Sequence, residues 1–175
     1  MRRPFPALLL FVVLVGSVHP MQAQAKSAYF FGSAGVTLPM GDYGDYAKGG
    51  WIGNAGVGYN ISDRANFGAE VMYGSNKHKS SDDRTDLLGV GGFLDYTVGN
   101  PKGKIVPYLL GGLGVLNQKF KPATGNSESE SKLMISGGGG LYFPMGTAGL
   151  YLESRYIKRG DTGFLGIAGG FTVGL

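Results

Sequence analysis

Ala168-Gly169-Gly170-Phe171-Thr172-Val173-Gly174-Leu175 alternates large apolar residues with small ones up to the last position of the chain. In an extended strand, Phe171, Val173 and Leu175 share one face, while glycine and threonine occupy the other. An unpaired amphipathic edge strand promotes aggregation in a soluble protein. In a closed barrel the last strand pairs with the first, so that no edge remains. We therefore expect this chain to close into a barrel.

The first 25 residues have the features of a secretory signal peptide. Arg2 and Arg3 give the positive start, residues 7–18 form an apolar run, and Ala23-Gln24-Ala25 matches a small-x-small cleavage site. The apolar run is shorter than the roughly 18 residues that a spanning helix needs, which disfavours an uncleaved anchor. We expect a signal peptide at residues 1–25, cleavage after Ala25 and a mature barrel domain at residues 26–175.

Composition excludes several classes of function. Without Arg2 and Arg3 the chain has 14 Lys and Arg against 12 Asp and Glu, so that nucleic-acid binding is not predicted. The absence of cysteine excludes disulfides, thiol nucleophiles and cysteine metal ligands. Glycine is abundant, at 33 of 175 residues, and lies within apolar segments such as 137–140. It permits the bending and close backbone approach that a narrow barrel requires.

Eight segments alternate between apolar residues and small or polar ones, and turn-forming residues separate them. Most reach the roughly 9–11 residues of a tilted transmembrane strand, and none shows a sustained helical pattern. Short connections are expected after the second, fourth and sixth segments, with longer polar ones after the first, third and fifth, as in outer-membrane barrels. The predicted fold class is all-β, an eight-stranded antiparallel up-and-down transmembrane β-barrel. The expected strands are 28–39, 51–62, 66–76, 85–98, 105–118, 133–144, 149–159 and 163–175.

One face of each segment is apolar, and the other carries small residues and isolated charges. We expect the apolar face to meet lipid and the narrow, glycine-rich face to line the interior. Aromatic residues on the apolar face gather near the strand ends, as in the girdles at two membrane interfaces. Strands also favour aromatic residues in general, which is the alternative explanation. The predicted girdle consists of Trp51, Tyr59, Phe67, Tyr73, Tyr96, Phe143 and Tyr156.

Residues 106–114, VPYLLGGLG, and 150–156, LYLESRY, resemble the fifth and seventh strands of the small outer-membrane barrels of the OmpA and OmpX type. The resemblance covers residues 26–175. It implies residence in the outer membrane, contact with its lipid and lipopolysaccharide, and insertion by the barrel-assembly machinery. The end of the chain is similar to the assembly signal of that family, although Ala168 stands where a polar residue is usual. The residues assigned to this signal are Gly170, Phe171, Val173 and Leu175.

Charges on the inner face form the first candidate site, a lumen charge network of Glu70, Asp95, Glu153 and Arg155. The third and seventh strands lie opposite each other in an eight-stranded barrel. We therefore expect Glu70 and Arg155 to meet across the lumen, with Glu153 nearby, whereas Asp95 has no evident partner. The network is interpreted either as a gate in a narrow pore or as a plug. The plug is favoured because side chains just fill the interior of eight strands.

No catalytic residue, metal site or cofactor is predicted. His78 precedes Ser80 with the spacing found in a lipid A deacylase of this fold, but Ser81 stands where that motif has asparagine. A base must also reach its nucleophile and be oriented by a third group, which a polar loop does not ensure. We interpret His78 as a solvated loop residue.

The favoured function is structural or interactive, namely outer-membrane integrity, adhesion or protection, with the lumen largely closed. A basic patch near the outer surface is expected to face lipopolysaccharide phosphates or solvent. The alternatives are a narrow gated pore, a lipid-modifying enzyme, and a soluble periplasmic barrel that binds a lipophilic molecule. The sequence does not identify a partner of the external loops. The patch consists of Lys77, His78, Lys79, Arg84, Lys119 and Lys121.

Overall fold

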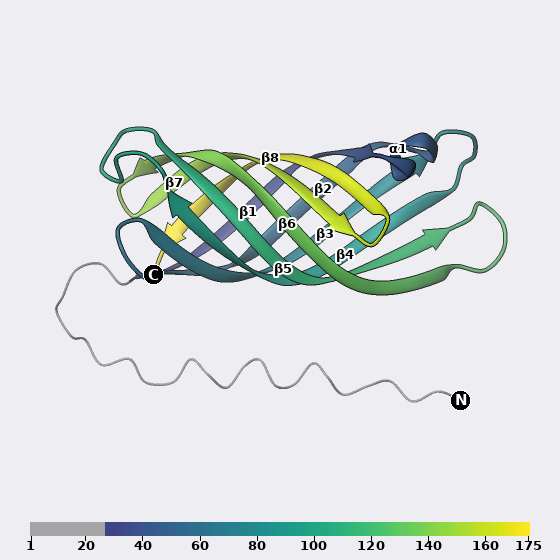
Figure 1. Ribbon diagram of the computed structural model, residues 1–175, viewed down its shortest axis with the longest axis horizontal. Helices are drawn as coiled ribbons and strands as arrows, with labels where there is room; N and C mark the ends of the chain where they lie inside the picture. The colour runs from purple at the N-terminus through teal and green to yellow at the C-terminus, as the bar shows by residue number, and fades with distance from the viewer. Residues whose placement is uncertain (1–26) are drawn as a thin grey trace, which may run out of the picture.

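The structure, a computed structural model, describes residues 27–175 as a closed barrel of eight antiparallel strands (Figure 1). Each strand pairs with its neighbours in chain order, and the last strand closes the barrel against the first. The predicted fold class is confirmed. The strands are β1 (Ala28–Met40), β2 (Ala47–Asn60), β3 (Ala65–His78), β4 (Arg84–Thr97), β5 (Val106–Lys121), β6 (Glu128–Met145), β7 (Ala148–Arg159) and β8 (Thr162–Gly174).

The predicted signal peptide and its cleavage site after Ala25 lie outside the described residues. Residues 27–175 include no helix that is long and apolar enough to cross a membrane. Their one helix is the short α1 (Asp42–Tyr46), which lies between β1 and β2.

The two ends of the barrel differ in what they carry. Ser27 and Leu175 lie at one end, called here the terminal end, where the Leu175 amide donates to the Ala28 carbonyl at 2.9 Å. The other end, called here the distal end, carries α1 and lies at the right of Figure 1. The connections at the terminal end are 61–64, 98–105 and 146–147, and those at the distal end are 41–46, 79–83, 122–127 and 160–161.

The expected contrast between short and long connections is only partly correct, because the connections after β2 and β6 are short but the one after β4 is long. The loop expected over 119–132 shrinks to 122–127, because β5 and β6 continue as a paired hairpin up to Phe120 and Glu128. The longest connection of the described chain, 98–105, instead lies at the terminal end. Backbone pairing continues beyond the apolar belt, through residues that are largely polar on both faces of β5 and β6. The apolar alternation that marks a strand in the sequence is lost there.

The outward faces of the strands form a continuous apolar belt. Each of these side chains is about half exposed and alternates along its strand with an inward residue. An exposed apolar surface of this extent suits lipid and not water. The belt includes Val36, Val57, Val71, Val90, Leu113, Ile135, Leu152 and Ile167.

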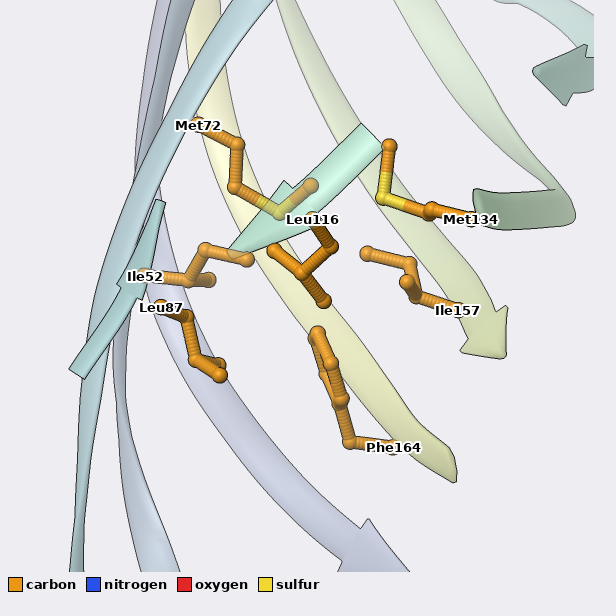
Figure 2. Close-up of a cluster of buried hydrophobic side chains, with 7 residues drawn as sticks. All are labelled: Ile52, Met72, Leu87, Leu116, Met134, Ile157 and Phe164. Atoms are coloured by element: carbon orange, nitrogen blue, oxygen red, sulfur yellow. The ribbon is translucent and has the colours of Figure 1, made fainter. Parts of the chain in front are cut away.

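Large apolar side chains also fill part of the interior, where the sequence pattern predicts small residues and charges. The structure shows that glycine on one strand makes room for a large side chain from another. A Cβ added at Gly89 would lie 3.0 Å from Met72 Cε and 3.3 Å from Leu116 Cδ1. This apolar cluster (Figure 2) consists of Ile52, Met72, Leu87, Leu116, Met134, Ile157 and Phe164. Each member contributes about 1.5–3 kcal/mol by leaving water.

The run 137–140 shows why some glycines are required and others are not. At Gly138, on the inner face of β6, an added Cβ would lie 2.1 Å from the Ser154 carbonyl oxygen of β7. At the adjacent Gly137, on the outer face, the nearest atom would be the Leu110 carbonyl oxygen at 4.0 Å. The inner glycine therefore permits a close approach of two backbones, which no larger residue allows.

Gly138→Ala should destabilise the barrel by about 1–3 kcal/mol, because the added methyl group must displace the backbone of β7. Gly137→Ala is the matched control and should change stability by less than about 0.5 kcal/mol. Urea unfolding in lipid vesicles, followed by the fluorescence of Trp51, the single tryptophan of the chain, measures both. Equal stability of the two variants would contradict this account of the packing.

Candidate functional site

An ion network crosses the middle of the lumen. Arg155, on β7, pairs through Nη1 with the carboxylate of Glu70 on β3 and donates from Nε to Glu153 Oε1 at 3.0 Å. The hydroxyl of Tyr108 donates to Glu153 Oε2 at 3.0 Å. Only 6 % of Arg155 and 4 % of Glu70 is exposed. The ion pair therefore connects two opposite strands within a shielded interior, where both charges need their partners.

The network lies directly on the terminal side of the apolar cluster. On β3, Glu70 and Met72 are successive inward positions, and on β7 Arg155 and Ile157 are likewise successive. Charged and apolar side chains thus occupy consecutive layers of the lumen. Since eight strands leave an interior that side chains just fill, the two layers together close it.

Asp95, the fourth residue of the predicted network, is not brought into it. It lies on β4 and lines a cavity of about 460 Å³ in the terminal half of the lumen. Within residues 27–175 it has no hydrogen bond or ion pair. Three of the four predicted residues therefore meet, and the fourth faces an open space.

Arg159 is a buried charged residue that is not among the predicted site residues. Its Nε donates to the Leu116 carbonyl at 3.0 Å, its Nη1 donates to Gln118 Oε1 at 2.6 Å, and its Nη2 donates to Glu130 Oε2 at 3.1 Å. It ties β7 to β5 and β6 on the distal side of the apolar cluster. Alternation along the strand could have identified Arg159 as inward-facing, because it continues the series of alternate residues that includes Arg155 and Ile157.

The distal loops are held together by contacts among themselves. Asp83 accepts from Ser81 Oγ at 2.7 Å and from the Ala123 amide at 2.8 Å, which links the second and third loops. These hydrogen bonds lower the pKa of Asp83 below its usual value. Lys79 Nζ donates to the Gly44 carbonyl at 2.6 Å and links the second loop to the first. The first three distal loops thus present one connected surface.

The interpretation of His78 as a solvated loop residue is wrong. It is the last residue of β3 and is half-buried, with its ring centroid 5.4 Å from that of Tyr46 and 5.2 Å from that of Phe120. Its Nε2 lies 2.9 Å from Thr85 Oγ1. The pKa of the neighbouring Tyr43 is raised, with burial as its largest cause. Extension of the strands and the added helix α1 enclose these rings, which the sequence pattern alone does not indicate.

An outer basic cluster surrounds Asp86 on neighbouring strands β3, β4 and β5, just distal to the apolar belt. Lys121 Nζ lies 2.5 Å from Asp86 Oδ2, Arg84 Nε lies 3.6 Å from Oδ1, and Ser75 Oγ donates to Oδ1 at 2.8 Å. Burial alone would raise the pKa of Asp86, but these contacts outweigh burial and lower it. The outer basic cluster consists of Lys77, Arg84, Asp86, Lys119 and Lys121.

The predicted girdle residues lie on the outer face at two heights. At the distal height the rings of Trp51 and Tyr73 have centroids 5.4 Å apart, and at the terminal height those of Tyr59 and Phe67 are 5.9 Å apart. Six of the seven are exposed, and Phe143 is half-buried.

The residues of the assembly signal lie on β8, where it pairs with β1. Phe171, Val173 and Leu175 are exposed on the outer face. At the inward Gly170, an added Cβ would lie 2.4 Å from the ring of Tyr151. A larger residue at position 170 would therefore displace that ring.

Comparisons with known proteins agree with this architecture. The family model of the outer membrane protein beta-barrel domain matches residues 8–175. No curated protein sequence matches the chain significantly. Within residues 27–175 no group of three or more His, Cys, Asp or Glu residues could hold a metal ion.

Three solved structures share the fold at low sequence identity. Neisserial surface protein A is 17% identical, with a TM-score of 0.69, 83% of this chain covered and 96% of that one. Ail of Yersinia pestis, in complex with the heparin analogue sucrose octasulfate, is 21% identical, with a TM-score of 0.59 and coverages of 86% and 98%. The N-terminal β-barrel domain of Pseudomonas aeruginosa OprF is 16% identical, with a TM-score of 0.53 and coverages of 87% and 100%.

Arg155→Met should destabilise the barrel by roughly 3–5 kcal/mol, because it leaves Glu70 charged and without its partner. The double variant Glu70→Leu/Arg155→Met should recover part of this loss, since it removes the two most buried charges and leaves Glu153 with its hydrogen bond from Tyr108. Urea unfolding in lipid vesicles measures both variants. A single variant as stable as the unmodified protein would show that the ion pair does not hold the lumen together.

Proposed function

The chain belongs to the outer membrane protein beta-barrel domain family, and we propose that it is a closed barrel that supports the outer membrane and presents its distal surface to partners. The observation that carries this proposal is the filling of the lumen. The apolar cluster and the ion network occupy consecutive layers within it. Passage through the barrel is therefore blocked, while the outer faces and the distal loops stay accessible, and the roles that fit are membrane integrity, adhesion and protection.

We place the terminal end in the periplasm and the distal end at the cell surface. The apolar belt gives the depth of the barrel in the bilayer, and the aromatic girdle residues mark its two interfaces. We also propose that the barrel-assembly machinery recognises β8 through the outward-facing Phe171, Val173 and Leu175, with Gly170 on the opposite face. The exposed position of these apolar side chains supports this role.

The gated pore is the second candidate, and the apolar cluster argues against it. A gate made by Glu70 and Arg155 would have to open a path that also passes Leu116 and Phe164. Neither of these side chains has measurable exposure. An ion crossing this layer would lose its hydration without gaining any polar partner.

Arg155→Ala should leave the barrel non-conducting in planar bilayers, because the apolar cluster still closes the lumen after the ion pair is removed. The measurement is single-channel recording of the unmodified protein and of the variant. A change of gel mobility on heating serves as the control for folding of each. Currents that appear or increase in the folded variant would support the gated pore.

The outer basic cluster is the strongest candidate for contact with lipopolysaccharide. Lys77 and Lys119 are exposed, and neither has an ion pair within the described residues. They face outward just above the apolar belt, at the height where lipid phosphates lie. Each cation near an anionic membrane surface contributes on the order of 1 kcal/mol to its attraction. We propose that these lysines bind lipid A phosphates, while Asp86 fixes Lys121 and Arg84 beside them.

Lys77→Gln/Lys119→Gln should weaken lipopolysaccharide binding by about tenfold or more, because two phosphate-facing charges are lost. The matched control is Lys102→Gln/Lys104→Gln, which removes two charges from the connection 98–105 at the terminal end and should change nothing. Titration of lipopolysaccharide against protein in detergent micelles measures both. Equal losses in the two variants would point to a nonspecific effect of net charge.

Neither remaining alternative receives support from the geometry. An apolar face that points outward is the reverse of what a soluble periplasmic barrel needs. For a lipid-modifying enzyme, the distinguishing measurement is lipid A composition after overexpression, which we expect to be unchanged.

A further inference from the structure

The terminal half of the lumen is a chamber that ends blindly. Its volume is about 460 Å³, and Ser27, Thr147 and Leu175 at the strand ends border it, so that it opens at the terminal end. Arg155 forms part of its inner end, and the apolar cluster lies beyond. A cavity of this size falls within the range of small-molecule sites. The proposed surface role does not use this chamber.

The charges in and beside the chamber do not balance. Three carboxylates, those of Glu70, Asp95 and Glu153, stand against the single guanidinium of Arg155. Arg155 is already engaged with Glu70 and Glu153. Asp95 lines the chamber and has no ionic partner within the described residues. Asp95 is half-buried, and a carboxylate that has lost part of its hydration favours a cation beside it.

The other groups that line the chamber offer acceptors and aromatic surfaces. The hydroxyls of Tyr29 and Tyr108 donate to Asn66 and to Glu153, at 2.9 Å and 3.0 Å. The side-chain oxygen of Asn54 is buried and accepts no hydrogen bond from a described residue. Buried acceptors are normally hydrogen-bonded, so a ligand that donates to the Asn54 oxygen would be stabilised in the chamber. Aromatic rings attract cations to their faces.

We propose that this chamber binds a small organic cation with a primary ammonium group, which enters from the periplasm and pairs with Asp95. An ammonium group donates three hydrogen bonds, which suits the Asp95 carboxylate, and the Asn54 oxygen is a further acceptor elsewhere in the lining. The donor set disfavours a metal ion, because no cluster of three or more metal-ligating side chains is found within residues 27–175. The inference is independent of the proposed contact with lipopolysaccharide, which concerns the opposite end and the outer face.

The test uses putrescine as the probe and 1,4-butanediol as its uncharged counterpart of similar length. Folded protein in detergent micelles is titrated with each and followed by the NMR shifts of its backbone amides. Putrescine should give saturable shifts around Asp95 and Tyr108, and butanediol should give none. Asp95→Asn should weaken putrescine binding at least tenfold. The matched control Asp82→Asn removes an exposed carboxylate from the distal loop 79–83 and should bind as the unmodified protein does.

Three outcomes would overturn the proposal. They are no saturable shift with putrescine, equal binding of putrescine and butanediol, and equal affinity of the unmodified protein and Asp95→Asn. If Asp95→Asn does not fold, as judged by gel mobility with and without heating, Asp95→Glu takes its place. That variant keeps the charge and should keep the binding. Loss of binding in folded Asp95→Glu, or shifts confined to the outer surface of the barrel, would equally reject the chamber as the site.

Discussion

The closed hydrogen-bonded ladder of eight strands is the constraint on which the rest of this structure depends. Pairing of β8 with β1 leaves no strand edge in the membrane, so that backbone groups are satisfied without water. Closure also assigns each residue of a strand either to lipid or to a lumen about as wide as its side chains. The outer face can be uniformly apolar because it meets lipid. On the inner face, each side chain must fit the space that the side chains of other strands leave.

In the lumen, glycines without a side chain lie opposite large side chains from other strands. Gly89 leaves space that Met72 and Leu116 fill, and Gly138 lets the backbones of β6 and β7 approach closely. Charged side chains follow the same logic, because Arg155 is long enough to reach Glu70 on the opposite strand. The result is a layered interior, with an open chamber at the terminal end, an ion network, an apolar cluster and a polar layer around Arg159. The ion network and the apolar cluster separate the chamber at the terminal end from the distal end of the barrel.

Local sequence was most informative where one face of a strand meets lipid. The number of strands and the inward direction of Glu70, Asp95, Glu153 and Arg155 follow from alternation, because a one-residue slip would expose these charges to lipid. It was least informative beyond the bilayer, where polar residues occur on both faces of a strand. There β5 and β6 continue through polar residues, and His78 lies in an aromatic enclosure instead of a loop.

The sequence by itself determined the class of the protein and the two-faced character of its strands, since both depend on the identities of neighbouring residues. Only the tertiary structure decided which inward residues meet. Arg155 contacts Glu70, 85 positions away in the chain, while Asp95 faces a chamber, and seven apolar residues from different strands form one cluster. The physical reason is that such contacts depend on the tilt and stagger of the closed barrel. These properties belong to all eight strands together, and no single segment encodes them.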